Sequence, residues 1–162
     1  MKRGFLFLSS AIAGVLFIAA LQFIGADAGA LSVSPADRLS IEQPQYSGKW
    51  KGNDLAVEYS YSKDQGQMDL SGKVLFSYSM VMGYSRMEDF RLAVIFLDEN
   101  GRVLKETGLA TNAGSFDPIS FHNRINLPSN AVFMAFSYQG RAYDTGSNSG
   151  GGITSFWHSP AY

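Results

Sequence analysis

The stretch from Phe90 to Thr107, FRLAVIFLDENGRVLKET, constrains the fold of this chain more than any other part. It contains an unbroken apolar run from Leu92 to Leu97, rich in β-branched and aromatic residues and too short for a typical helix. The segment from Arg102 to Thr107 alternates between two faces, as a second strand does. Between them, Asp98-Glu99-Asn100-Gly101 supplies turn-forming residues and a glycine that can adopt positive φ. The stretch predicts a β-hairpin whose first strand lies in the middle of a sheet.

Other segments show the same two-residue period or the same short apolar run. They lie at residues 55–62, 68–78, 119–127, 131–138 and 153–157. With the hairpin they predict seven strands, and no helical period of useful length occurs after the N-terminal region. The frequent glycines and aromatic residues suit strands joined by tight turns. We therefore expect an all-β fold, a seven-stranded antiparallel β-sandwich that is immunoglobulin-like or jelly-roll-like.

The N-terminus predicts export. Lys2 and Arg3 precede an uncharged run from Phe5 to Gly25. A cleavable signal peptide has an apolar region of about 7 to 15 residues, whereas a transmembrane helix needs about 20. The run favours a retained anchor, while the small residues at 26–30 leave a cleaved signal peptide as the alternative. One N-terminal hydrophobic helix is expected at residues 1–25, with everything after it on the periplasmic or extracellular face of the cytoplasmic membrane.

Residues 26–53 are rich in small residues and contain prolines, so we expect a tether there and the β-sandwich domain at 54–162. Tyr46 and Trp50 interrupt the polarity of this tether, which predicts that both pack on the domain edge or at a membrane interface.

Charge and cysteine content exclude several classes of function. The formal net charge is −1, and the 13 basic residues are scattered rather than clustered. This distribution lacks the basic surface that nucleic-acid binding needs. The absence of cysteine excludes disulfides, thiolate metal sites and cysteine nucleophiles.

Strand direction predicts where a partner binds. If every successive strand reverses, the tight turns at 63–66, 98–101 and 128–130 share one pole, while the long connections at 79–89, 108–118 and 140–152 share the other. The tether is expected to enter at this second pole. Long loops on a rigid scaffold usually carry function. We therefore expect one contact surface for a protein partner, for example a membrane complex, built from Met80, Met82, Tyr84, Asn112, Phe116, Tyr143 and Asp144.

Carbohydrate binding is the alternative function, because exposed aromatic rings can stack on sugars. The aromatic residues to test are Trp50, Tyr84, Tyr143 and Trp157. For Trp157 the competing interpretation is packing on the sandwich core.

Catalytic and metal sites receive little support from the sequence. Asp117, Ser120 and His122 are close in the chain, but no Gly-x-Ser-x-Gly elbow is present. His122 and His158, with nearby methionines, are the candidate copper ligands, but each stands alone in the sequence. Oxygen ligands for calcium occur in Asp98-Glu99-Asn100, which a hairpin turn already explains, and in the pair Asp144 and Asn148.

The sequence thus predicts an exported, membrane-anchored interaction module that acts as a non-catalytic accessory subunit, without a cofactor, metal or catalytic residue. A hydrolase of unknown type is the third possibility, after carbohydrate binding.

Overall fold

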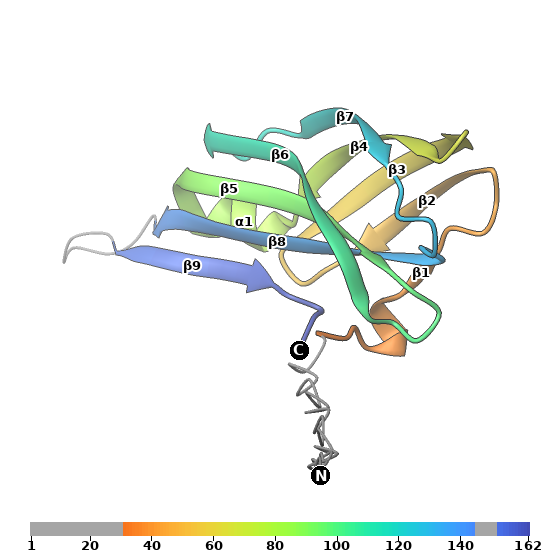
Figure 1. Cartoon of the computed structure of the whole chain (residues 1–162). Coiled ribbons are helices and arrows are strands. Elements are labelled where there is room, and N and C mark those ends of the chain that lie inside the picture. Colours follow the sequence, from red (N-terminus) through yellow and green to blue (C-terminus); the bar gives the residue numbers. More distant parts are fainter. Residues whose placement is uncertain (1–30, 145–151) are drawn as a thin grey trace, which may run out of the picture.

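The computed structural model describes residues 31–144 and 152–162. These residues form two antiparallel β-sheets that pack face to face, with one 3-10 turn, η1 (Pro35–Asp37), and one short helix, α1 (Tyr78–Gly83) (Figure 1). The prediction of an all-β chain with two antiparallel sheets is confirmed. The described residues contain nine strands rather than the seven predicted. The helix predicted at residues 1–25 lies outside the described part of the chain.

Three of the four strands of one sheet are consecutive in the chain. Its order is β2 (Gln45–Lys51), β3 (Leu55–Asp64), β4 (Gln67–Phe76) and β7 (Ile119–Asn126). The five-stranded sheet has β8 (Phe133–Asp144), β5 (Tyr84–Leu97) and β6 (Val103–Gly114) in that order, and β1 (Leu39–Ser40) and β9 (Ile153–His158) both pair with the other side of β8.

The main core lies between the two sheets. In β3, every second side chain from Leu55 to Tyr61 is buried, as the two-residue period predicts. Trp50 of β2 reaches into the same core, where its ring lies 5.7 Å from that of Phe136. Burial of these large rings supplies the hydrophobic stabilisation that holds the sheets together.

A second, smaller cluster lies on the outer face of the five-stranded sheet. Ile95, Leu97 and Ala135 are buried there beneath Val33, which comes from the N-terminal segment. This cover explains why the runs 92–97 and 131–138 are apolar on both faces. It also confirms that both segments are central strands.

Part of the predicted tether belongs to the folded domain. Residues 45–51 form β2, which pairs with β3 from Gln45↔Ser62 to Lys51↔Ala56. The polar residues that made this segment look like a linker are exposed side chains of this edge strand, whereas Trp50 is its one buried side chain. The described fold therefore begins well before Asp54.

The tight turns gather at one end of the sandwich, which we call the turn pole. Leu127 N donates to Gly66 O at 2.9 Å, and Val132 N donates to Leu97 O at 3.0 Å, so the three turns adjoin one another. The opposite end carries α1 and is called the α1 pole. All paired strands are antiparallel, as the alternation of direction requires.

The connections at the α1 pole differ from the long loops expected. Residues 79–89 contain most of α1 and the start of β5, β6 continues to Gly114, and β8 continues to Asp144. Residues 145–151 lie outside the described chain.

The N-terminal entry also differs from the prediction. Val33 N donates to Gly101 O at 2.9 Å, and Val33 pairs with Ala161. The described chain therefore enters at the turn pole, with its two ends side by side (Figure 1). The sequence predicts that the chain enters at the α1 pole, where β3 begins. Because the additional strand β2 runs from the turn pole to the α1 pole before β3, the described chain enters at the turn pole instead.

Candidate functional site

The helix α1 is held on the core by a cap and one buried side chain. Ser77 precedes it as the N-cap, and its Oγ accepts a hydrogen bond of 3.4 Å from Met80 N. The Met80 side chain is only 4% exposed and belongs to the main core. A short helix is marginal on its own, so this packing is what places it.

The other side of α1 presents apolar side chains to solvent. Tyr78 is 80% exposed, Val81 47% and Met82 59%. We call these three residues the α1 surface. The run from Ser77 to Ser85 contains no charged residue. Scattered exposed apolar residues are ordinary, but three on one uncharged element form a patch of the kind that marks interaction sites.

The structure brings four of the seven predicted site residues together beneath or beside this surface. Met80, Tyr84 and Asp144 line a cavity of about 290 Å³, and the Tyr84 ring lies 6.5 Å from that of Phe116. Phe116 in turn packs edge-on against Phe76 at 5.4 Å. Of these four residues, Met80 is buried, Tyr84 and Phe116 are half-buried and Asp144 is exposed. The two half-buried rings and Met80 hold the α1 pole together.

The remaining predicted residues have separate places. Met82 is the one of the seven that belongs to the α1 surface. Asn112 Nδ2 donates to Ser115 O at 3.2 Å and stabilises the turn after β6. Tyr143 lies on the five-stranded sheet, where the Arg86 guanidinium stands 4.1 Å from its ring centroid.

Sequence reasoning missed Tyr78 and Val81. The signal that could have identified them was the uncharged, apolar run SYSMVMGY at residues 77–84. Because this run has no strand or helix periodicity, the sequence predicts a loop there. Because the helix is six residues long, its exposed face is defined by the burial of Met80 rather than by a repeating pattern.

Ion pairs and one partly buried hydrogen bond stabilise the surroundings of the α1 pole. The Arg141 guanidinium contacts the Asp89 carboxylate at 2.5 Å and the Glu88 carboxylate at 3.4 Å, and these carboxylates raise the pKa of Arg141. The Tyr138 hydroxyl donates to Asp54 Oδ2 at 2.7 Å, and burial together with this hydrogen bond raises the pKa of Tyr138.

The candidate catalytic residues are not assembled around a common point. His122 Nδ1 is hydrogen-bonded to Ser71 Oγ at 2.7 Å on the exposed face of the four-stranded sheet. Asp117 Oδ2 accepts from Ser115 Oγ in the β6–β7 turn. Within residues 31–144 and 152–162, no carboxylate is hydrogen-bonded to His122, so this arrangement lacks the group that orients the imidazole in a serine-histidine-aspartate triad.

The candidate metal ligands are likewise separated or already engaged. His158 is on the five-stranded sheet, with its ring 5.2 Å from that of Trp50, whereas His122 is on the other sheet. Asp98 Oδ1 accepts from Asn100 N and Arg102 N, both at 2.9 Å, as a hairpin turn requires. Asn148 lies outside the described residues. Among the described residues, no group of three or more His, Asp or Glu side chains is arranged to hold a metal ion.

The two tryptophans have opposite environments. Trp50 is buried, at 8% exposure, as an edge-packed residue. Trp157 is 68% exposed, so the interpretation that it packs on the sandwich core is wrong, and its neighbour Phe156 is buried instead.

Comparison with known proteins identifies no relative: no family model, no curated protein and no solved structure matches this chain. Its function is therefore inferred from the geometry of its own residues.

Proposed function

We propose that this protein is an exported, membrane-anchored and non-catalytic accessory module that binds a protein partner through the α1 surface. The observation that carries the proposal is the exposure of Tyr78, Val81 and Met82 on an uncharged helix. Burying such side chains against a complementary surface is favourable by about 25 cal/mol per Å² of apolar area.

The α1 surface is already shaped before a partner arrives. The Ser77 cap, the buried Met80 and the packing of Tyr84 on Phe116 hold the helix in place. A pre-ordered surface loses little conformational entropy on binding. The partner that fits it is a protein with an apolar, uncharged depression.

The position of the N-terminal entry supports a partner that binds away from the membrane. Residues 26–30 separate the predicted apolar segment from Leu31, a length of at most about 18 Å when fully extended. The chain enters at the turn pole, whereas β5 alone is about 45 Å long at 3.3 Å per residue. If residues 1–25 are retained in the bilayer, the α1 surface lies at the end of the sandwich opposite the pole at which the described chain enters.

The export proposal depends on the predicted leader at residues 1–25. Among the described residues, none of the helices has the length and apolar character that crossing a bilayer requires. The N-terminal mass of protein purified from membranes distinguishes a retained anchor from a cleaved signal peptide. The finer assignment of the sandwich as immunoglobulin-like or jelly-roll-like stays a prediction; the run of three consecutive strands β2-β3-β4 differs from the ABED order of immunoglobulin sheets.

Photo-crosslinking tests the proposed surface in the full chain. A benzophenone amino acid at position 82 should crosslink one discrete protein in intact cells, whereas the same group at position 60, on the exposed face of β3, should not. The double variant Val81→Ser and Met82→Ser should abolish co-purification of that protein with an unchanged melting temperature, because both side chains are exposed.

Tyr84 is unsuitable for this test, since its packing on Phe116 would also be lost. Equal crosslinking from positions 60 and 82, or full co-purification with the double variant, would contradict the proposal.

A further inference from the structure

The outer face of the five-stranded sheet is only half covered. Val33 and Ala161 lie over its turn-pole half. Beyond them, a cavity of about 540 Å³ opens on β5, β6 and β8, and it adjoins a second cavity of about 370 Å³ that extends to β9. The two cavities share Arg91 and Gln139, so they form one trough across four strands. We call this trough the sheet groove.

One row of side chains crosses the groove. Strand register places Trp157 opposite Gln139, Gln139 opposite Arg91, and Arg91 opposite Thr111. With strands about 4.8 Å apart, this row is roughly 14 Å long. It combines one exposed aromatic ring with a carboxamide, a guanidinium and a hydroxyl.

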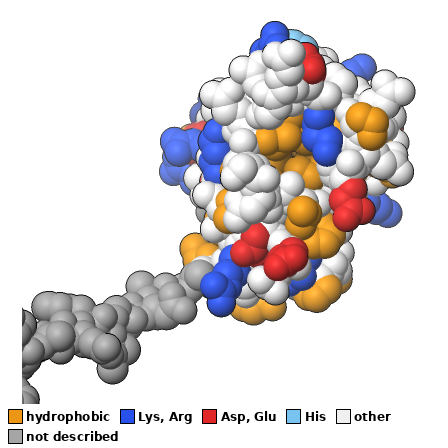
Figure 2. Space-filling view, turned by 45° about the vertical axis from the view of Figure 1, so that its right-hand side comes forward, with side chains coloured by type: hydrophobic (Ala, Val, Ile, Leu, Met, Phe, Trp, Pro, Cys, Tyr) orange, Lys and Arg blue, Asp and Glu red, His pale blue; other side chains and the backbone are white. Residues whose placement is uncertain are grey.

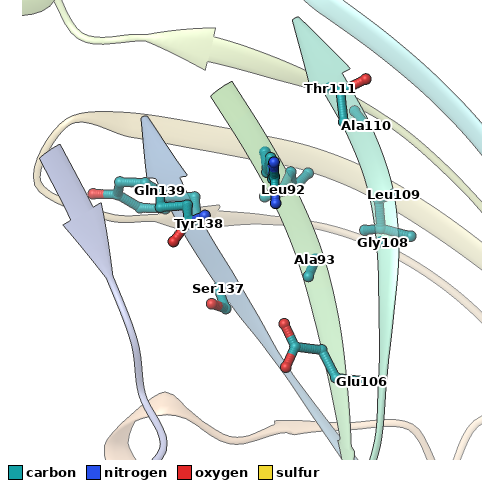
Figure 3. A pocket seen from close by; sticks show the side chains of 11 residues that line it. Leu92, Ala93, Glu106, Gly108, Leu109, Ala110, Thr111, Ser137, Tyr138 and Gln139 are labelled. Atoms are coloured by element: carbon teal, nitrogen blue, oxygen red, sulfur yellow. The ribbon is translucent and has the colours of Figure 1, made fainter. Parts of the chain in front are cut away.

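The floor beside this row consists of small residues. Ala93 pairs with Ser137 on one side and with Gly108 on the other. A Cβ added at Gly108 would have nothing within 4 Å. Figure 3 shows the Glu106 carboxylate extending from β6 toward the side of β8 that carries Ser137. The groove is therefore shallow and open, with polar groups on its rim.

These polar groups are not engaged with one another. Within the described chain, neither Arg91 nor Glu106 forms an ion pair, although Arg141, at the end of the groove, is paired with Asp89 and Glu88. No hydrogen bond of the described residues uses the side chains of Gln139 or Thr111. The two charged groups of the groove without an ion pair, Arg91 and Glu106, have opposite signs. In the space-filling view of Figure 2, basic and acidic side chains are likewise both present on the visible face of the molecule.

We infer that the sheet groove binds a neutral carbohydrate chain. The apolar C–H face of a sugar ring can pack on the exposed indole of Trp157, as other apolar groups do on aromatic rings. Planar guanidinium, carboxamide and carboxylate groups match adjacent hydroxyls with paired hydrogen bonds. The small residues at the floor let a ring approach the sheet. This site is independent of the proposed partner surface on α1.

Other ligand classes suit the groove less well. An extended peptide gains affinity mainly from main-chain hydrogen bonds at a sheet edge. Strands β5 and β8, which carry Arg91 and Gln139 in the middle of the groove, already pair with neighbours on both sides, so a peptide could add a strand only at the outer edges, β6 and β9, and not along the row of side chains.

A polyanion needs several free cations. Of the two arginines that line the groove, only Arg91 has no ion pair with another described residue, because Arg141 is paired with Asp89 and Glu88. Glu106 adds a negative charge to the rim.

Titration of the full chain with defined saccharides tests the inference. The probes are cellohexaose, chitohexaose and maltohexaose, with polygalacturonate as the anionic comparison, measured by calorimetry and tryptophan fluorescence. Because Trp50 is buried and Trp157 exposed, a neutral hexasaccharide should change the fluorescence of Trp157. Trp157→Ala should weaken binding about tenfold, whereas Trp157→Phe should retain most of the affinity.

A second test uses a substitution that fills the sheet groove. Gly108→Val should abolish saccharide binding without lowering the melting temperature, because the added atoms project into open space. Ile153→Ala, another exposed residue of β9, and Met82→Ser on α1 are the matched controls and should bind as the unaltered protein does.

The inference is overturned if no neutral hexasaccharide binds, or if binding persists in both Trp157→Ala and Gly108→Val. Tighter binding of polygalacturonate than of the neutral probes would reject a neutral ligand. Loss of partner crosslinking in Gly108→Val, without any saccharide binding, would instead assign the groove to the protein interface.

Discussion

Two buried tyrosines differ in whether their hydroxyl groups are hydrogen-bonded. The Tyr61 hydroxyl is buried and has no hydrogen-bond partner among the described residues, whereas the Tyr138 hydroxyl donates to Asp54 Oδ2 at 2.7 Å. A buried polar group without a partner costs free energy, while a satisfied one contributes to stability.

Tyr61→Phe should therefore raise the free energy of unfolding by about 1 kcal/mol, since it removes an unsatisfied hydroxyl and keeps the ring. Tyr138→Phe should lower it by roughly 1 to 2 kcal/mol, because Asp54 loses its donor. Urea unfolding of the two variants measures both effects. Equal destabilisation by the two substitutions would show that Tyr61 has a partner, such as ordered water.

At the scale of the element, the packing of β4 against β7 depends on Gly72, whose lack of a side chain lets the Phe121 ring lie directly over the β4 backbone. The ring of Phe121 on β7 lies over Gly72, and an added Cβ would lie 2.5 Å from Phe121 Cζ and overlap the Glu58 carbonyl oxygen. Two neighbouring strands would have to shift to admit even one methyl group.

Gly72→Ala should lower the free energy of unfolding by roughly 1 to 3 kcal/mol, the usual cost of overpacking a close-packed site. Gly108→Ala is the matched control on the other sheet. It meets no neighbour and should leave stability the same or raise it by about 0.4 to 1 kcal/mol through the unfolded state. Thermal melts of both variants test this, and equal losses would show that β4 tolerates the added methyl group.

At the scale of the whole molecule, the N-terminal segment completes both layers of the fold. Trp50 fills the main core, and Val33 covers the outer cluster of the five-stranded sheet. Strand β2 also protects the edge of β3 through seven residue pairs.

A chain of residues 31–162 should therefore unfold cooperatively, whereas a chain of residues 54–162 should not. The shorter chain exposes apolar surface that Trp50 and Val33 otherwise cover. Near-ultraviolet circular dichroism during heating measures the difference. A sharp transition in the shorter chain would show that the fold is stable without residues 31–53.

Local patterns in the sequence determined the seven strands β3 to β9, the hairpin between Phe90 and Thr107 and the central place of residues 92–97, because periodicity and turn chemistry act between near neighbours. Strands β1 and β2 were recognised only from their pairing with β8 and β3. Which of two adjacent aromatic residues faces inward was decided only by pairing: the register between β8 and β9 buries Phe156 and exposes Trp157. The same holds for the exposed side of α1, for the entry at the turn pole and for the row of side chains across four strands. Each of these depends on contacts between segments distant in the chain, and a side chain's environment there is determined by its partners rather than by its neighbours in sequence.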